Sequence, residues 1–260
     1  MDNKEFYIQN DGIRIHAKLD FPKMPAGSIE RFPLVIIIHG FTGHMEERHI
    51  IAAAEAMNEV GYATLRAEMY GHGKTGGHFC DHTLYKWVTC ALAVVDYAKT
   101  LDFVESLYLC GHSQGGLLTI LVAAMEKDLF RAIIPMSPAI SIPECARSGE
   151  LLGCHFDPEH IPEILKMDNG RTLNGNYIRI AQTIDVDRAI DRYNGPVLLI
   201  HGSKDETIPI RYSYKAAEKY KNATLVVIPE DTHCYDHHLE LVTEAIRKFL
   251  LQIDIQVERT

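Results

Sequence analysis

The stretch Leu107-Tyr-Leu-Cys-Gly-His-Ser-Gln-Gly-Gly-Leu-Leu118 joins a short β-type run to the pattern G-x-S-x-G and then to an apolar helical run. We expect a strand, a sharp turn with Ser113 at its tip, and a helix that starts at Gln114. The glycines on both sides of Ser113 suit such a turn, because glycine permits tight bending and close backbone approach. The Gln114 N–H, at the positive end of the helix, is a suitable donor to a developing oxyanion. The pattern therefore predicts a nucleophilic serine.

Length and composition place this stretch in one large domain. The 260 residues, of which 47% are apolar, can bury the core of an α/β domain that carries an insertion. A formal charge of −9 argues against a nucleic acid or an anionic membrane surface as partner. The N-terminus lacks a charged-then-apolar leader, and no stretch reaches 18 apolar residues, so we expect a cytoplasmic protein that does not enter a membrane. Whether it forms a homodimer is left open.

The cysteines and histidines predict neither disulfides nor a metal. Six cysteines occur without C-x-x-C spacing, in a chain large enough not to need disulfides. Cys110 is expected to be buried and inert, whereas Cys234 is better placed for modification. Fourteen histidines include no H-E-x-x-H pattern, and no Cys/His quartet is present. We therefore expect no metal and no cofactor.

Alternating strands and helices flank the central stretch. Residues 5–8 and 13–19 surround Asn10-Asp-Gly12, a turn signal that predicts an antiparallel hairpin at a sheet edge. The β-branched run 34–39 predicts a strand that is covered on both faces. Further strands are expected at 63–67, 131–136, 196–201 and 224–228, helices at about 47–59, 83–99, 210–220 and 236–252, and a loop at 70–77. This order predicts a mainly parallel, doubly wound sheet that binds ligands at the carboxyl ends of its strands.

The alternation stops between residues 138 and 193. This segment is rich in Pro, Asp, Glu and Gly, with weak helical patterns at 159–166 and 176–190. A segment of this length without a function would be unusual. We interpret it as a cap inserted over the sheet, so that residues 1–137 and 194–260 form the core.

A nucleophilic serine needs a base, and the base needs an acid to fix its tautomer. In this architecture the chain order is serine, acid, histidine, with each residue just beyond a strand. Asp205 follows the strand that ends at His201, and its spacing from the strand and from Pro209 favours it over Glu206. Glu206 is more simply a solvated carboxylate.

The base is expected in the loop after the next strand. His233 lies in that loop, whereas His237 and His238 fall in the first turn of a helix and are interpreted as surface residues. Asp231 lies only two residues before His233, so we expect it to cap the turn.

A second oxyanion donor is expected after the strand 34–39. There, the backbone N–H of Phe41 would act with that of Gln114. His39, His112 and His201 adjoin strand ends and are interpreted as packing histidines.

Taken together, these motifs resemble those of a known family. His39-Gly-Phe-Thr-Gly43, Gly111-His-Ser-Gln-Gly-Gly116, Asp205 and His233 are similar to those of α/β-hydrolases of the serine esterase kind. Within the insertion, Phe156-Asp-Pro-Glu-His-Ile-Pro162 and Gly175-Asn-Tyr-Ile-Arg-Ile-Ala-Gln182 resemble the substrate-covering subdomain of bacterial cinnamoyl (feruloyl) esterases. The resemblance covers nearly the whole chain.

The resemblance implies a triad of Ser113, Asp205 and His233, with Phe41 and Gln114 as oxyanion amides, in agreement with the reasoning from the residues. It alone implies that Tyr177 is a pocket residue; the alternative is a partly buried tyrosine on an amphipathic helix.

The chain departs from the family pattern at two places. Glu68 stands where similar hydrolases usually carry Asp, a conservative change that should keep the loop at 70–77. No acidic or amide side chain around Cys145–Gly153 clearly matches the one that relatives place near the phenolic hydroxyl of the substrate.

The leading hypothesis is a cofactor-free carboxylic ester hydrolase that forms an acyl-enzyme. By the resemblance, its small-molecule substrates would be feruloyl, caffeoyl or p-coumaroyl esters of sugars or quinate. A general short-acyl esterase or monoacylglycerol lipase is the alternative, although the polar, acidic insertion differs from an apolar lipase cover. A non-catalytic binding protein of the same fold is a third hypothesis, against which the intact order of nucleophile, acid and base argues.

Overall fold

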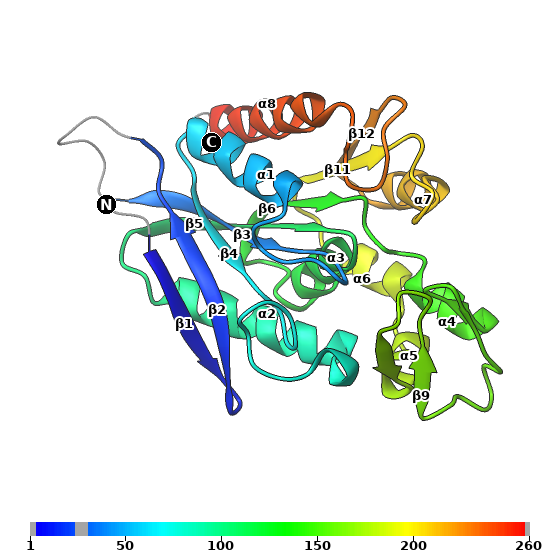
Figure 1. Ribbon diagram of the computed structural model, residues 1–260. Helices are drawn as coiled ribbons and strands as arrows, with labels where there is room; N and C mark the ends of the chain where they lie inside the picture. The colour runs from blue at the N-terminus through cyan, green and yellow to red at the C-terminus, as the bar shows by residue number, and fades with distance from the viewer. Residues whose placement is uncertain (1–3, 24–30, 258–260) are drawn as a thin grey trace.

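A computed structural model describes residues 4–23 and 31–257 of the chain. The central sheet of this part has eight strands in the order β1-β2-β4-β3-β5-β6-β11-β12 (Figure 1). They are β1 (Lys4–Asn10), β2 (Ile13–Asp20), β3 (Phe32–Ile38), β4 (Ala63–Ala67), β5 (Val104–His112), β6 (Phe130–Met136), β11 (Val197–Gly202) and β12 (Ala223–Ile228). From β4 to β12 all neighbours pair in parallel. This is the mainly parallel, doubly wound sheet that the sequence predicts.

The expected N-terminal hairpin is confirmed. β1 pairs antiparallel with β2, and β1 is the sheet edge. Asp11 and Gly12 between them both have positive φ, 44° and 80°, which suits the twist of a two-residue hairpin turn.

Helices cover both faces of the sheet (Figure 1). α1 (Arg48–Glu59) and α8 (Leu239–Val257) lie on one face; α2 (Leu84–Lys99), α3 (Gln114–Met125), α6 (Val186–Arg192) and α7 (Arg211–Lys219) contribute to the other. Strand β3 is apolar throughout because helices cover both of its faces. Ile36 and Ile38 pack toward the side of α2 and α3, and Val35 and Ile37 pack toward α1 and α8. None of the helices in the described ranges is long and apolar enough to cross a membrane.

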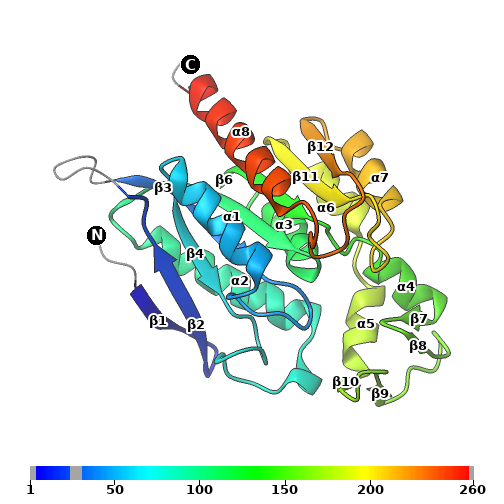
Figure 2. The same cartoon turned by 45° about the horizontal axis from the view of Figure 1, so that its top comes forward.

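Residues 142–182, most of the chain between β6 and β11, stand at one end of the sheet (Figure 2). The chain between β6 and β11 comprises α4 (Ile142–Ser148), β7 (Glu150–Leu151), β8 (Cys154–His155), β9 (Ile164–Lys166), β10 (Thr172–Asn174), α5 (Asn176–Gln182) and then α6. β7 pairs with β8, and β9 with β10. α6 packs on α3 and so belongs spatially to the helical layer under the sheet.

Two expectations within this segment are corrected. The helix predicted at 159–166 is wrong: 164–166 form β9, and the chain before it has no regular structure. Pro158 and Pro162 explain this, because proline lacks an N–H and disfavours helix at the preceding residue. The helix predicted at 176–190 is two helices, since Asp185 starts α6 by accepting a hydrogen bond from Arg188 N (2.9 Å).

Candidate active site

Ser113 occupies the sharp turn between β5 and α3. Its φ of 55° and ψ of −118° lie in a region that L-residues rarely adopt, so the surroundings must hold it there. Ser113 N donates to Met136 O on β6 (2.9 Å), and Ser113 O accepts from Leu117 N (3.0 Å). A methyl group at Gly115 would lie 2.3 Å from Ile38 O, so only glycine lets α3 approach β3 this closely. The turn at Ser113 and the helix start at Gln114 are as expected, and β5 begins at Val104, three residues before the stretch from which the strand was predicted.

Asp205 and His233 meet because their strands are neighbours. β11 and β12 pair in parallel, so the loops after them leave the same edge of the sheet. His233 Nδ1 lies 2.7 Å from Asp205 Oδ2, while Oδ1 accepts from Thr207 N (2.9 Å) and Ile208 N (2.8 Å). Since a carboxylate only accepts, Nδ1 carries the hydrogen and His233 Nε2 is left to act as base.

The Asp205 carboxylate is fully buried and stays ionised. Burial raises the pKa of Asp205, but the hydrogen bonds from His201 and His233 more than offset this and hold the pKa well below its ordinary value. An ionised carboxylate in this position can stabilise a positive charge on the imidazole that it contacts.

Two buried histidines that were interpreted as packing residues contact this pair. His201 Nε2 lies 3.1 Å from Asp205 Oδ2, and its Nδ1 lies 2.7 Å from Ser213 Oγ. His112 Nε2 lies 2.8 Å from the carbonyl oxygen of His233. Sequence reasoning missed both contacts. The only sequence signal for these contacts was that each histidine lies at the end of a strand. His112 comes one residue before Ser113, and His201 comes four residues before Asp205.

The alternatives for acid and base lie elsewhere. Asp231 caps the loop as expected, accepting from Thr232 N (2.8 Å), His237 N (3.1 Å) and His238 N (2.8 Å). Glu206 is exposed at the rim of the cleft that Ser113 lines. In the described part of the chain, no side-chain hydrogen bond or ion pair joins Glu206, His237 or His238 to Asp205 or His233. His237 and His238 precede α8, which begins at Leu239, so their expected place in its first turn is wrong.

Phe41 and Gln114 line the cleft beside Ser113. The carbonyl oxygen of Phe41 bonds to His72 Nε2, which fixes the loop after β3. His39 also holds this loop. Met69 N donates to His39 Nε2 (3.0 Å), so the hydrogen of the neutral ring is on Nδ1, which donates to Gly40 O (2.7 Å). Burial lowers the pKa of His39 to about 3 and keeps it neutral. His39 is thus a packing histidine.

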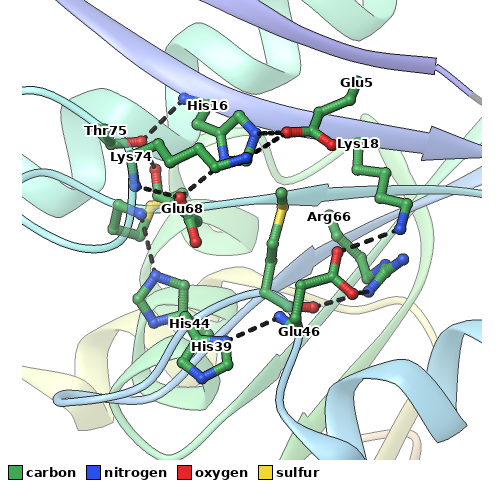
Figure 3. Close-up of polar contacts among 12 residues, drawn as sticks. Glu5, His16, Lys18, His39, His44, Glu46, Arg66, Glu68, Lys74 and Thr75 are labelled. Atoms are coloured by element: carbon green, nitrogen blue, oxygen red, sulfur yellow. Dashed lines mark hydrogen bonds and ion pairs between the residues drawn. The ribbon is translucent and has the colours of Figure 1, made fainter.

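The loop at 70–77 is held by Glu68, one of the departures noted in the sequence (Figure 3). Its Oε2 accepts from Lys74 N (2.6 Å) and lies 2.8 Å from His16 Nδ1. The longer carboxylate thus performs the loop-holding task expected of the usual aspartate.

Tyr177 lies behind the cleft. Its side chain is fully buried, and its hydroxyl donates to Gln114 Oε1 (2.5 Å). Its ring packs against Phe41, with centroids 5.7 Å apart. Tyr177 is therefore not among the residues that line the cleft, and its predicted contact with a substrate would require the cleft to extend past Gln114.

The cleft has a volume of about 720 Å³, within the range of small-molecule sites. Apolar side chains from the inserted segment form one wall: Ile142, Leu151 and Leu152. Its charged lining is Glu47, Glu150 and Glu206, with no Lys or Arg among the described residues that form it.

All six cysteines are free thiols. Cys110 is buried, which raises its thiol pKa far above the ordinary value. Cys234 lines the cleft, and burial raises its pKa to about 11, so it is a weak nucleophile despite its position. Within residues 4–23 and 31–257, no three His, Cys, Asp or Glu side chains are grouped as a metal would require.

Comparison with known proteins agrees with this geometry. Residues 30–164 match the model of the family described as serine aminopeptidase, S33, and residues 177–259 match that of TAP-like proteins. Est1E from Butyrivibrio proteoclasticus, solved with ferulic acid bound, is 59% identical with a TM-score of 0.93, over 96% of this chain and 99% of that one.

Curated relatives are more distant. Human ABHD12B is 24% identical over 74% of this chain, and the chain spans about half (51%) of the length of that protein. Human mitochondrial palmitoyl-protein thioesterase ABHD10 is 24% identical over 80% of this chain and 69% of its own length.

Proposed function

This chain belongs to the S33 serine hydrolases of the α/β-hydrolase fold, and from that premise we propose that it hydrolyses carboxylic esters of hydroxycinnamic acids. The observation that carries the proposal is the likeness, at 59% identity over nearly the whole of both chains, to a protein solved with ferulic acid bound. The apolar wall of the cleft suits an aromatic acyl group, which gains stability by leaving water.

We assign the chemistry as follows. Ser113 Oγ attacks the ester carbonyl carbon while His233 Nε2 takes its proton, and Asp205 stabilises the imidazolium. The backbone N–H groups of Phe41 and Gln114 bind the oxyanion. The tetrahedral intermediate collapses, the bond to the alcohol oxygen breaks, and His233 gives that oxygen its proton. Water then attacks the acyl-enzyme by the same route and releases the acid.

We propose that residues 138–193 act as a cap that selects the acyl group, since the sheet and its loops supply the reacting groups. Tyr177 would support the oxyanion residue Gln114 from this cap. The six free cysteines favour action in a reducing compartment such as the cytoplasm. The substrate is a small neutral ester.

A substrate panel tests the proposal. Purified protein is assayed with ethyl ferulate, p-nitrophenyl butyrate, monoolein and leucine p-nitroanilide. We expect the highest kcat/KM for ethyl ferulate. A preference for monoolein would favour a lipase, and one for the anilide an aminopeptidase. Labelling of Ser113 by a fluorophosphonate, read by mass spectrometry, separates an enzyme from a non-catalytic binder.

A further inference from the structure

Glu47 is a carboxylate in the cleft that the proposed reaction does not use. It lines the same cleft as Ser113 and His233. Although it occupies the N-cap position of α1, its side chain makes no capping hydrogen bond. The side chain of Glu47 folds back instead, and its Oε2 accepts a hydrogen bond from His44 N (3.3 Å). It lies so close to Gly43 that a methyl group added there would be only 2.1 Å from Oε2.

The neighbouring residue Glu46 shows what is unusual about Glu47. Glu46 forms ion pairs with Lys18 and Arg66, each at 3.3 Å (Figure 3). In the described ranges no Lys or Arg lies within ion-pair distance of Glu47, its Oε1 accepts no hydrogen bond, and His49 Nε2 is 4.0 Å from Oε2. Burial raises the pKa of Glu47 above its ordinary value, and the His44 amide and the charges of His44 and His233 offset only part of this rise. Its Oε1 therefore has the capacity to accept a hydrogen bond from a ligand.

The position of Glu47 relates it to the leaving alcohol. His233 must return its proton to the alcohol oxygen, so the alcohol leaves on the side of His233. Glu47, His233 and Cys234 all line this cleft. An alcohol that leaves on the side of His233 would therefore pass Glu47.

The charge of the cleft lining restricts which alcohols the site can accept. The three charged residues that line the cleft in the described chain are all acidic: Glu47, Glu150 and Glu206. An alcohol with its own carboxylate, such as quinate, would be repelled, whereas a neutral alcohol with a second hydroxyl can donate to Glu47.

We propose that Glu47 is a specificity-determining residue whose carboxylate accepts a hydrogen bond from a hydroxyl of the leaving alcohol, and so selects esters of neutral polyols such as sugars. This inference rests on the proposed ester hydrolysis.

Three esters with one acyl group test it: ferulate esterified to ethanol, to glycerol and to quinate. In Glu47→Gln the ratio of kcat/KM for the glycerol ester to that for the ethyl ester should fall about 10- to 100-fold, the range for a hydrogen bond to a charged group. The quinate ester should be hydrolysed relatively faster than by the parent. Glu46→Gln, the same change at the neighbouring carboxylate, which does not line this cleft, is the matched control and should leave the glycerol-to-ethyl ratio within twofold.

The outcomes are distinct. Equal losses of activity on the glycerol and ethyl esters would mean that Glu47 supports the turn or the base, and no loss on either would remove it from the site; both overturn the inference. If the parent hydrolysed no ferulate ester while Ser113 still reacted with the fluorophosphonate, the proposed function would fail instead.

A measurement on the parent protein tests the inference even if the Glu47→Gln variant does not fold. Because the acyl-enzyme can pass its acyl group to an added alcohol that occupies the leaving-group site, glycerol should accept feruloyl groups several-fold better than 1-propanol at equal concentration. Equal transfer to both alcohols would contradict the inference.

Discussion

The turn around Ser113 and the inserted segment from α4 to α5 differ in how they are held. Every residue of α3 from Gln114 to Ala124 is buried, and the turn is fixed by backbone bonds to the strand β6 and by glycine contacts with β3. The segment α4 to α5 instead has strands of two or three residues and relies on side-chain bonds such as those of Gln182. Substitutions in the turn around Ser113 should therefore change the hydrolysis of every substrate alike. Substitutions in the segment from α4 to α5 should change the hydrolysis only of substrates that reach it.

The largest expected effect is that of Ser113→Ala. Loss of the nucleophile should lower kcat by roughly 10⁶-fold for small and aromatic esters alike, as it does in subtilisin. The hydroxyl makes no structural bond among the described residues, so the melting temperature should stay close to that of the parent. Activity within tenfold of the parent would refute the assignment, and a Ser113→Ala/His233→Ala double variant should be no worse than either single one.

Asp205→Asn should have the next largest effect. The asparagine oxygen would stay on the Thr207 and Ile208 amides, which turns its NH₂ group toward His233 Nδ1 and forces the hydrogen onto Nε2. The base then cannot accept the serine proton. By analogy with the corresponding change in chymotrypsin, kcat should fall on the order of 10⁴-fold.

Glu206→Gln is the control for the acid, and its kcat should stay within a few-fold of the parent. If Glu206→Gln were the more damaging change, measured with p-nitrophenyl acetate, the acid would be Glu206.

How far the sequence predicts the molecule follows the same division. The sheet could be predicted because β-branched runs such as β3 and turn signals such as Asp11-Gly12 are local, and β4 has the bounds expected. The chain order and loop positions were enough to expect Asp205 and His233 together, and the structure brings them into contact. Their catalytic roles, like that of Ser113, stay predictions.

What could not be predicted depends on contacts between distant residues. Strands as short as β7 to β10 carry too few residues to show a period, and one helix was expected where β9 lies. The bond from Tyr177 to Gln114 joins residues 63 positions apart, and nothing local marks it. The contact of His201 with Asp205 is local, but a histidine at a strand end equally fits simple packing.

Tyr177→Phe tests whether a side chain of the cap supports the proposed oxyanion residue Gln114. Removing the hydroxyl leaves Gln114 Oε1 buried without its donor, in a side chain whose Nε2 already has no partner among the described residues. Because the Gln114 amide is the proposed oxyanion donor, we expect kcat to fall about 5- to 30-fold, or roughly 1–2 kcal/mol, on ethyl ferulate and p-nitrophenyl acetate alike. A loss confined to ethyl ferulate would instead make Tyr177 a substrate contact.

The smallest effect is expected from Gln182→Ala, within the cap itself. Gln182 Nε2 donates to Pro158 O (2.9 Å) and Ala146 O (3.2 Å), so one side chain ties α5 to α4 and to the loop before β9. Loss of these bonds should loosen the cap by about 1–2 kcal/mol while leaving β5 and α3 intact. Hydrogen exchange should accelerate in α4 and residues 156–163 alone, p-nitrophenyl acetate hydrolysis should change less than twofold, and ethyl ferulate hydrolysis should fall two- to fivefold. Faster hydrogen exchange in α3 as well would show that the cap unfolds together with β5 and α3 as one unit, since both regions share a continuous apolar core.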